Sequence, residues 1–153
     1  MYKAIKTAKQ MIDAKKRPGV ISVAPDSTVL AALELLAEHD IGALVVIEEG
    51  RPVGILSERD CARKVELQGR TAATTRVRDI MTAKVLAVRP EQSPEDCRRI
   101  MGAARIRHLP VVDGGRAIGM LSSKDILDEV IAEDEQLIRR LETERLMTSA
   151  GQY

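Results

Sequence analysis

The sequence contains no Phe or Trp, and its only two tyrosines, Tyr2 and Tyr153, stand at the chain ends. An aromatic platform of the kind that stacks single-stranded nucleic acid is therefore excluded. The core has to be packed from Leu, Ile, Val, Ala and Met. The longest uninterrupted apolar run, 41–47, is far shorter than the ~20 residues that a membrane-spanning helix needs. No membrane span is expected.

Cysteine and net charge are also scarce. Cys61 and Cys97 have neither a CxxC spacing nor a surrounding pattern of metal ligands, so we expect two reduced thiols and no metal site. The chain has 24 Lys and Arg against 23 Asp and Glu, and a formal charge of +1 gives no global field toward nucleic acid or anionic lipid. Residues 1–19 include lysines but no apolar stretch of a secretory signal, which predicts a cytoplasmic protein.

The chain does contain a long internal repeat. The stretch GILSERD at 54–60 returns as GMLSSKD at 119–125, and a constant offset of 65 aligns 20–65 with 85–130 without a gap. Each copy is expected to form a short strand, a helix, two strands joined by a glycine turn, and a second helix. The predicted fold class is α+β, with two pseudo-symmetric βαββα units and flanking N- and C-terminal helices.

Several helix boundaries can be predicted from the sequence. In copy two, Ser93 is a suitable N-cap with Asp96 three residues later, and Thr28 takes the cap position in copy one. One more helix is expected around 5–14, and a long one over 124–146 has apolar residues on one face. The sequence leaves open whether this last helix folds back on its own domain or packs on a second subunit.

Each repeat has a serine followed three residues later by an aspartate, namely Ser57 with Asp60 and Ser122 with Asp125. This spacing forms a helix capping box, which by itself explains the repetition. A strand-to-helix junction also suits an anion, because free backbone N–H groups and the helix dipole favour negative charge. Serine beside a phosphate and aspartate on ribose hydroxyls would then suit a nucleotide.

The two copies differ most where Arg107 and His108 replace the small residues at 42–43. Two adjacent side chains that can carry positive charge suit phosphate oxygens. Arg59 and Lys124, inside the two repeated motifs, could add charge to the same phosphates. As isolated surface residues, all of these would be ordinary solvated cations.

With these motifs the sequence resembles the tandem cystathionine-β-synthase (CBS) domain pair, or Bateman module, in its stand-alone bacterial form. The resemblance covers about residues 20–130 and rests on the signature GhxSxxD, present twice, and on IRHLPVVDGGRAIG. It implies an N-terminal helical segment at 1–19, a first CBS repeat at 20–66, a linker at 67–84, a second repeat at 85–131 and a C-terminal helix extension at 132–153.

The resemblance implies a module without catalytic activity that binds an adenosine-containing ligand in the clefts between its repeats, forms a homodimer and signals to an unknown partner protein. AMP, ADP and ATP are the first candidates and NAD(H) the next. S-adenosylmethionine comes last, because Arg107 and His108 would repel its sulfonium. Neither nucleic acid nor a membrane is expected as a partner.

The resemblance also implies which residues hold the ligand. Asp60 and Asp125 would hold ribose, Ser57 and Ser122 would lie beside the ribose or phosphate, and Arg107 and His108 would contact phosphates. Adenine would lie near Ile21, Val23 and Pro110 in one site and near Leu86, Val88 and Val45 in the other. Gly42 and Ala43, which take the place of the cationic pair in copy one, predict unequal affinities at the two sites.

Other functions are weighed against this one. A ligand-free structural or adaptor dimer would use its serine–aspartate pairs only as helix caps. An enzyme has little support, because the sequence lacks GxxxxGK[ST], HExxH and GxSxG motifs and neither cysteine has an evident base. Nucleic-acid binding would depend on a few cleft cations in a nearly neutral protein.

Overall fold

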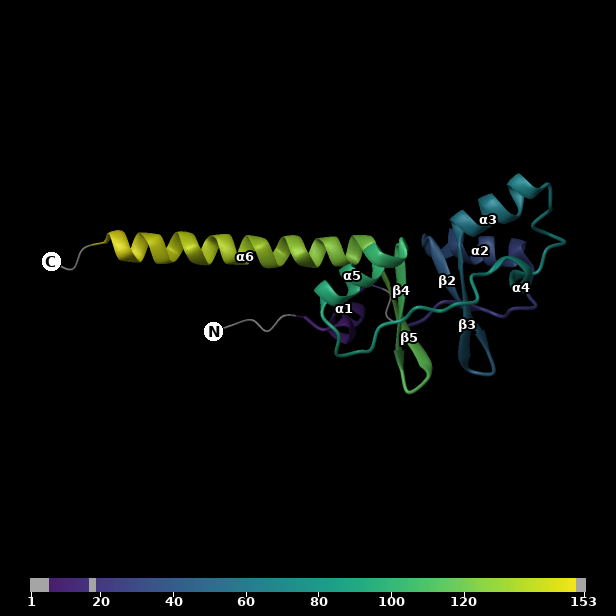
Figure 1. Cartoon of the computed structure of the whole chain (residues 1–153), viewed down its shortest axis with the longest axis horizontal. Helices are drawn as coiled ribbons and strands as arrows, with labels where there is room; N and C mark the ends of the chain where they lie inside the picture. Colours follow the sequence, from purple (N-terminus) through teal and green to yellow (C-terminus); the bar gives the residue numbers. More distant parts are fainter. Residues whose placement is uncertain (1–5, 17–18, 151–153) are drawn as a thin grey trace.

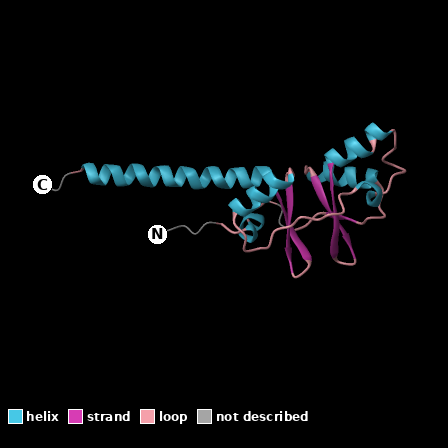
Figure 2. Ribbon diagram, in the orientation of Figure 1, coloured by secondary structure: helices cyan, strands magenta, loops and turns pink. Residues whose placement is uncertain are grey.

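The computed structural model describes residues 6–16 and 19–150, which form two α/β halves side by side and one long projecting helix (Figure 1). The strands of the two halves lie side by side, and the helices lie mainly on the outer sides of these strands (Figure 2). The elements in chain order are α1 (Ala8–Asp13), β1 (Ser22–Val23), α2 (Val29–His39), β2 (Ala43–Glu48), β3 (Arg51–Ser57), α3 (Glu58–Lys64), the 3₁₀ helix η1 (Glu66–Gln68), α4 (Val77–Ile80), α5 (Pro94–Ala104), β4 (His108–Asp113), β5 (Arg116–Ser122) and α6 (Ser123–Ser149). The predicted α+β class with two repeats is confirmed.

Each half is built on an antiparallel hairpin, β2–β3 in the first and β4–β5 in the second. The registers match at the offset of 65, since Val46 faces Gly54 and Val111 faces Gly119. The turns contain two successive residues of positive φ, as in Gly114 and Gly115, which is the conformation that short hairpins favour. The predicted hairpins are confirmed.

The first strand differs between the halves. β1 pairs in parallel with β2, where Ser22 faces Val45. The strand expected at 85–88 is reduced to a single parallel bridge between Val88 and Val111, so that expectation is wrong. Pro110 stands at the position equivalent to Val45, and a proline has no N–H with which to extend the ladder.

The helices begin where the caps predict. The Thr28 hydroxyl accepts a hydrogen bond from Ala31 N at the start of α2, and Ser93 with Asp96 forms a full capping box at α5. Each half has its own core of aliphatic residues. Both cysteines are buried and free, and burial raises the pKa of each thiol to about 11, so they are packing residues rather than reactive groups.

Two short segments, which we call the arms, complete these cores. Arm one covers 8–16 and contains α1, and arm two covers 77–85 and contains α4. Each arm precedes one repeat in the sequence and packs on the other, because α1 lies in the core of the second half and α4 in that of the first. Their backbone contacts match pair by pair: the N–H groups of Ala8 and Lys9 donate to Gln92 and Pro90, and those of Val77 and Arg78 donate to Ser27 and Pro25.

Both arms cross a strand at the repeated glycine of the GxLSxxD motif. A Cβ added at Gly119 would lie 2.7–2.9 Å from three atoms of Ile12, and one at Gly54 would lie 2.5 Å from the sulfur of Met81. Both separations are too short for real atoms. The glycine is therefore repeated because each arm passes directly against the strand at this point.

The C-terminal helix α6 leaves the second half after its first turns. Ile126 is buried and Val130 packs against the second core, but every residue from 134 to 150 is exposed. Figure 1 shows the helix extending away from both halves, so it does not fold back on its own domain. None of the helices among residues 6–16 and 19–150 is both long and apolar enough to cross a membrane.

Replacing Gly119 by alanine should lower the free energy of unfolding by about 1–3 kcal/mol, because the added methyl group overlaps Ile12. Urea unfolding followed by far-UV circular dichroism measures this. The control is Gly102→Ala, because Gly102 lies within α5 and a Cβ added there has no neighbour within 4 Å among the described residues beyond its own stretch of helix. This substitution should stabilise the protein by about 0.5–1 kcal/mol, since alanine is a better helix former than glycine. Equal stabilities of the two variants would contradict the crossing.

Candidate functional site

Two cavities contain residues from both repeats. The Ser122 cavity, about 450 Å³, includes Met120 and Ser122 from β5 together with Ile21, Gly42 and Ala43 of the first half. The Ser57 cavity, about 600 Å³, includes Ile55 and Ser57 from β3 together with Leu86 and Arg107 of the second. Both volumes lie within the range of roughly 300–1,000 Å³ that is common for small-molecule sites.

The two cavities correspond to each other through the repeat. Ile21 matches Leu86 and Ser122 matches Ser57 at the offset of 65. His108 and Gly42 line both cavities, and an added Cβ at Gly42 would touch the His108 ring at 3.4 Å. The imidazole therefore lies over Gly42 between the two sites.

The structure brings together most of the predicted site residues. Ile21, Gly42, Ala43, His108 and Ser122 line the Ser122 cavity, and Leu86, Ser57, Arg59, Asp60, Arg107 and His108 line the Ser57 cavity. The remaining predicted residues line neither: Val23, Val45, Val88 and Pro110 are buried, Lys124 pairs with Asp128 with its side chain 84% exposed, and Asp125 is hydrogen-bonded to Ser122. The four aliphatic residues therefore pack in the interior, and Lys124 lies on the surface.

Both serine–aspartate pairs form complete capping boxes. Ser57 Oγ accepts a hydrogen bond from Asp60 N at 3.1 Å, and Asp60 Oδ2 accepts one from Ser57 N at 3.0 Å. The equivalent distances for Ser122 and Asp125 are 3.2 and 2.8 Å. The capping role that the sequence allows is therefore real. It uses only Oδ2 of each carboxylate, so it does not exclude a ligand at the other oxygen.

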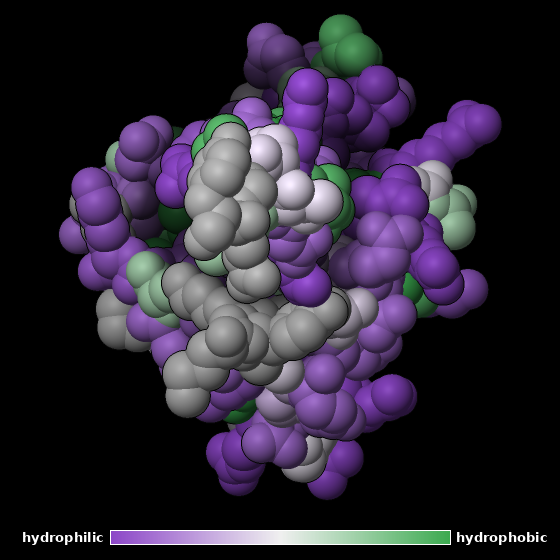
Figure 3. Space-filling view, turned by 90° about the vertical axis from the view of Figure 1, so that its left-hand side faces the viewer, coloured by the Kyte–Doolittle hydropathy of each residue, from purple (hydrophilic) through white to green (hydrophobic). Residues whose placement is uncertain are grey.

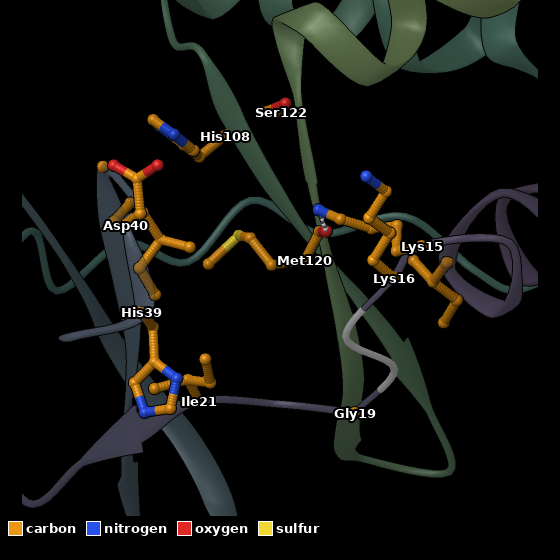
Figure 4. A pocket seen from close by; sticks show the side chains of 13 residues that line it. Lys15, Lys16, Gly19, Ile21, His39, Asp40, His108, Met120 and Ser122 are labelled. Carbon is orange, nitrogen blue, oxygen red and sulfur yellow. Dashed lines mark hydrogen bonds between the residues drawn. The ribbon is translucent and has the colours of Figure 1, made fainter. Parts of the chain in front are cut away.

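A lysine contacts each of these carboxylates, by a different route. Lys64 lies one turn along α3 and its Nζ is 3.1 Å from Asp60 Oδ1. Lys15 comes from arm one, and its Nζ donates at 2.9 Å to the Met120 carbonyl (Figure 4) and, also at 2.9 Å, to Asp125 Oδ2. Burial acts to raise the pKa of Asp125, but the hydrogen bonds from Ser122 and the ammonium of Lys15 together hold it below its usual value.

His108 is partly buried between the cavities. Burial lowers its pKa below the usual 6.5, and the positive charge of Lys15 lowers it further, against the opposing effect of Asp125. Figure 4 shows His108 and Asp40 across the Ser122 cavity from Lys15 and Lys16. The ring is therefore neutral near pH 7, and an anion placed beside it would favour its protonation.

Several lining residues were missed by sequence reasoning. Lys84 and Arg105 line the Ser57 cavity, and Lys15 and Asp40 line the Ser122 cavity. Comparison of the copies at the offset of 65 pairs Arg105 with Asp40 and could have identified both. The arms align at an offset of 69 instead, which pairs Lys84 with Lys15. Because this offset is four residues longer than that of the repeats, an alignment at 65 does not show the match.

Comparison with known families agrees with this architecture. The family model of the CBS domain matches the chain twice, at residues 13–67 and 77–132. The chain belongs to the CBS domain family. The matched ranges include all of arm two and residues 13–16 of arm one as well as the repeats, and they contain every lining residue of the two candidate cavities except Ile12.

The chain matches different shares of its curated relatives. The chain is 39% identical over 121 residues to the mitochondrial CBS domain-containing protein CBSX3 of Arabidopsis thaliana, matching 76% of this chain and 59% of that protein. It is 34% identical over 107 residues to YhcV of Bacillus subtilis, matching 70% and 76%. It is 36% identical over 127 residues to inosine-5′-monophosphate dehydrogenase of Korarchaeum cryptofilum, matching 82% of this chain and 25% of that protein.

Solved structures of CBS proteins share the fold. A CBS-domain protein from Burkholderia ambifaria MC40-6 has a TM-score of 0.77 at 44% identity, over 83% of this chain and 95% of that one. The CBS domain pair of MJ0100, solved with 5′-methylthioadenosine and S-adenosyl-L-methionine, has a TM-score of 0.74 at 25% identity, over 84% and 98%. The hexameric CBS-CP12 protein of bloom-forming cyanobacteria has a TM-score of 0.74 at 27% identity, over 98% and 92%.

The stability of this CBS pair should fall as the pH drops through about 6.5, because His108 binds a proton more readily in the unfolded chain than in the folded one. Urea unfolding of the wild type and of His108→Gln between pH 8 and pH 5.5 measures the effect. The wild type should lose stability relative to the variant on the acid side. Parallel curves over the whole range would show that His108 titrates alike in both states.

Proposed function

We propose that this CBS pair is a non-catalytic regulatory module that binds an adenosine nucleotide between its repeats and signals its occupancy to a partner protein. AMP, ADP and ATP are the favoured ligands, followed by NAD(H), with S-adenosylmethionine last. We place the phosphates in the Ser57 cavity. The protein is proposed to act in the cytoplasm as a homodimer.

The difference in charge between the two cavities carries this proposal. Four basic residues, Arg59, Lys84, Arg105 and Arg107, line the Ser57 cavity against Glu58 and Asp60. The Ser122 cavity has Asp40 and Gly42 where the Ser57 cavity has Arg105 and Arg107. Its two lysines are Lys16 and Lys15, and Lys15 is already paired with Asp125. Arginine forms bidentate hydrogen bonds to phosphate oxygens, so an anionic ligand should prefer the Ser57 cavity.

The remaining parts of a nucleotide also find suitable partners there. Asp60 is nearly buried at 12% side-chain exposure, and its carboxylate is the acceptor that ribose hydroxyls require. Ile55, Leu86 and Ile106 give the cavity an aliphatic wall for a purine. The ligands of the MJ0100 domain pair are adenosyl compounds, which supports this class of ligand.

The second candidate function is an adaptor that acts through protein contacts with empty cavities. The complete capping boxes favour it, because they explain both serine–aspartate pairs without a ligand. The clustering of Lys84, Arg105 and Arg107 does not follow from capping, however. All three are exposed on the lining of the same cavity, where a bound phosphate would gain favourable contacts with several positive charges.

Thermal unfolding with added ligands tests the proposal. A dye or circular dichroism has to report it, because the chain has no tryptophan. AMP, ADP, ATP, NAD, NADH and S-adenosylmethionine should be compared, each well above its dissociation constant. A ligand at 100 times that constant stabilises by ~2.7 kcal/mol, on the order of 5–10 °C for a chain of this length. No shift with any of these compounds would favour the adaptor.

Replacing Arg107 by alanine should weaken binding of the active nucleotide by at least ~10-fold, since a hydrogen bond to a charged group contributes about 1.5–3 kcal/mol. Adenosine without phosphates should bind both proteins alike. Isothermal titration calorimetry measures each affinity. Lys124→Ala is the control, because Lys124 is an exposed cation of the same repeat that lies outside both cavities. Equal losses in the two variants would refute a phosphate site at Arg107.

A further inference from the structure

The projecting part of α6 has an apolar stripe that its own chain does not cover. The helix has 27 residues, about 40 Å, and it is exposed from residue 134 onward. Leu127, Ile131, Ile138 and Leu141 remain 47–57% exposed. Most helical stability in proteins comes from packing of an apolar face, so such a helix needs a partner. Viewed from its end, this side of the molecule is mostly hydrophilic, with single hydrophobic side chains between (Figure 3).

The stripe has the spacing of a coiled coil. Its members alternate at intervals of four and three residues: Leu127, Ile131, Asp134, Ile138, Leu141, Arg145 and Thr148. This is three heptads of the a and d pattern, which places all seven side chains along one seam. Only Asp134 and Arg145 are charged among them.

These two charged residues specify both the partner and its direction. Asp134 and Arg145 are placed symmetrically in the sequence about the midpoint between residues 139 and 140. In an antiparallel pair of identical helices centred on that midpoint, Asp134 faces the partner's Arg145 and Ile138 faces the partner's Leu141. In a parallel pair, Asp134 would face Asp134 and Arg145 would face Arg145. Within residues 6–16 and 19–150, neither has an ion-pair partner of its own.

The rest of α6 has the same polarity. Residues 128–135 contain five acidic side chains and no basic one, whereas 139–145 contain three arginines and two glutamates. Burial raises the pKa of Glu133, and the negative charges of the neighbouring Glu129 and Asp134 raise it further. In the antiparallel register centred between 139 and 140, this acidic block lies along the partner's residues from 144 onward, where Arg145 is the one arginine that faces it.

We propose that residues 131–148 of α6 form an antiparallel two-stranded coiled coil with the same segment of a second copy of this chain. Two Asp134–Arg145 pairs then flank a centre made of Ile138 and Leu141 from both copies. The two CBS pairs lie at opposite ends of the coil, with their cavities outside it. This dimer does not depend on any bound nucleotide.

Charge reversal in the full chain tests the pairing. Sedimentation velocity should show that Asp134→Arg and Arg145→Asp each weaken the dimer by at least ~10-fold, because like charges then face each other. The double variant, Asp134→Arg with Arg145→Asp, should restore it. Gln136→Arg, on the opposite side of the helix, is the control and should leave the dimer unchanged. A monomeric wild type, or a dimer insensitive to both single reversals, would overturn the proposal.

Disulfide cross-linking tests the direction separately. Mixing Asp134→Cys chains with Arg145→Cys chains should give a cross-link between the two kinds of chain, identified by their different masses. Cys61 and Cys97 are buried and should not compete. Cross-links between two Asp134→Cys chains would indicate a parallel pair, and no cross-link at all would place the interface elsewhere. Either result would contradict the antiparallel coil.

Discussion

The close crossing of each arm over a hairpin is the constraint on which the rest of the structure depends. At Gly54 and Gly119 the strand leaves room for the arm only because the residue has no side chain. The crossing allows Ile12 and Met81 to fill the two halves and anchors the arms against them. The crossing also positions the residues that follow Ile12 and Met81 in each arm, and these include the lysines that line the two cavities.

The two candidate sites show how one architecture can acquire different chemistry. The capping boxes at Ser57 and Ser122 are nearly superimposable in their hydrogen bonds, since helix geometry specifies them. The lysine beside each aspartate is not repeated in the sequence: Lys64 is local, whereas Lys15 lies 110 residues from Asp125. The same placement of charge is thus reached twice by separate routes, while the arginines of 105 and 107 occur in one copy alone.

Local features could be predicted from the sequence and those that depend on tertiary contacts could not. The hairpins and the caps at Thr28 and Ser93 follow from residues a few positions apart. The arms were missed because they align at a different offset from the repeats. Lys124 was assigned to the site because it lies in the motif, but its position in the first turn of α6 directs it to solvent. The strand at 85–88 fails because of Pro110, a residue of the neighbouring strand.

The exchange of arms also makes the two halves topologically unequal. The first half is continuous in the chain, from β1 to α4, whereas the second consists of α1 together with everything from Val88 onward. The first half is in effect a domain inserted into the second, joined to it by two neighbouring connections. Both α1 and α6 therefore pack on the second half, which gathers the two ends of the described chain around one core.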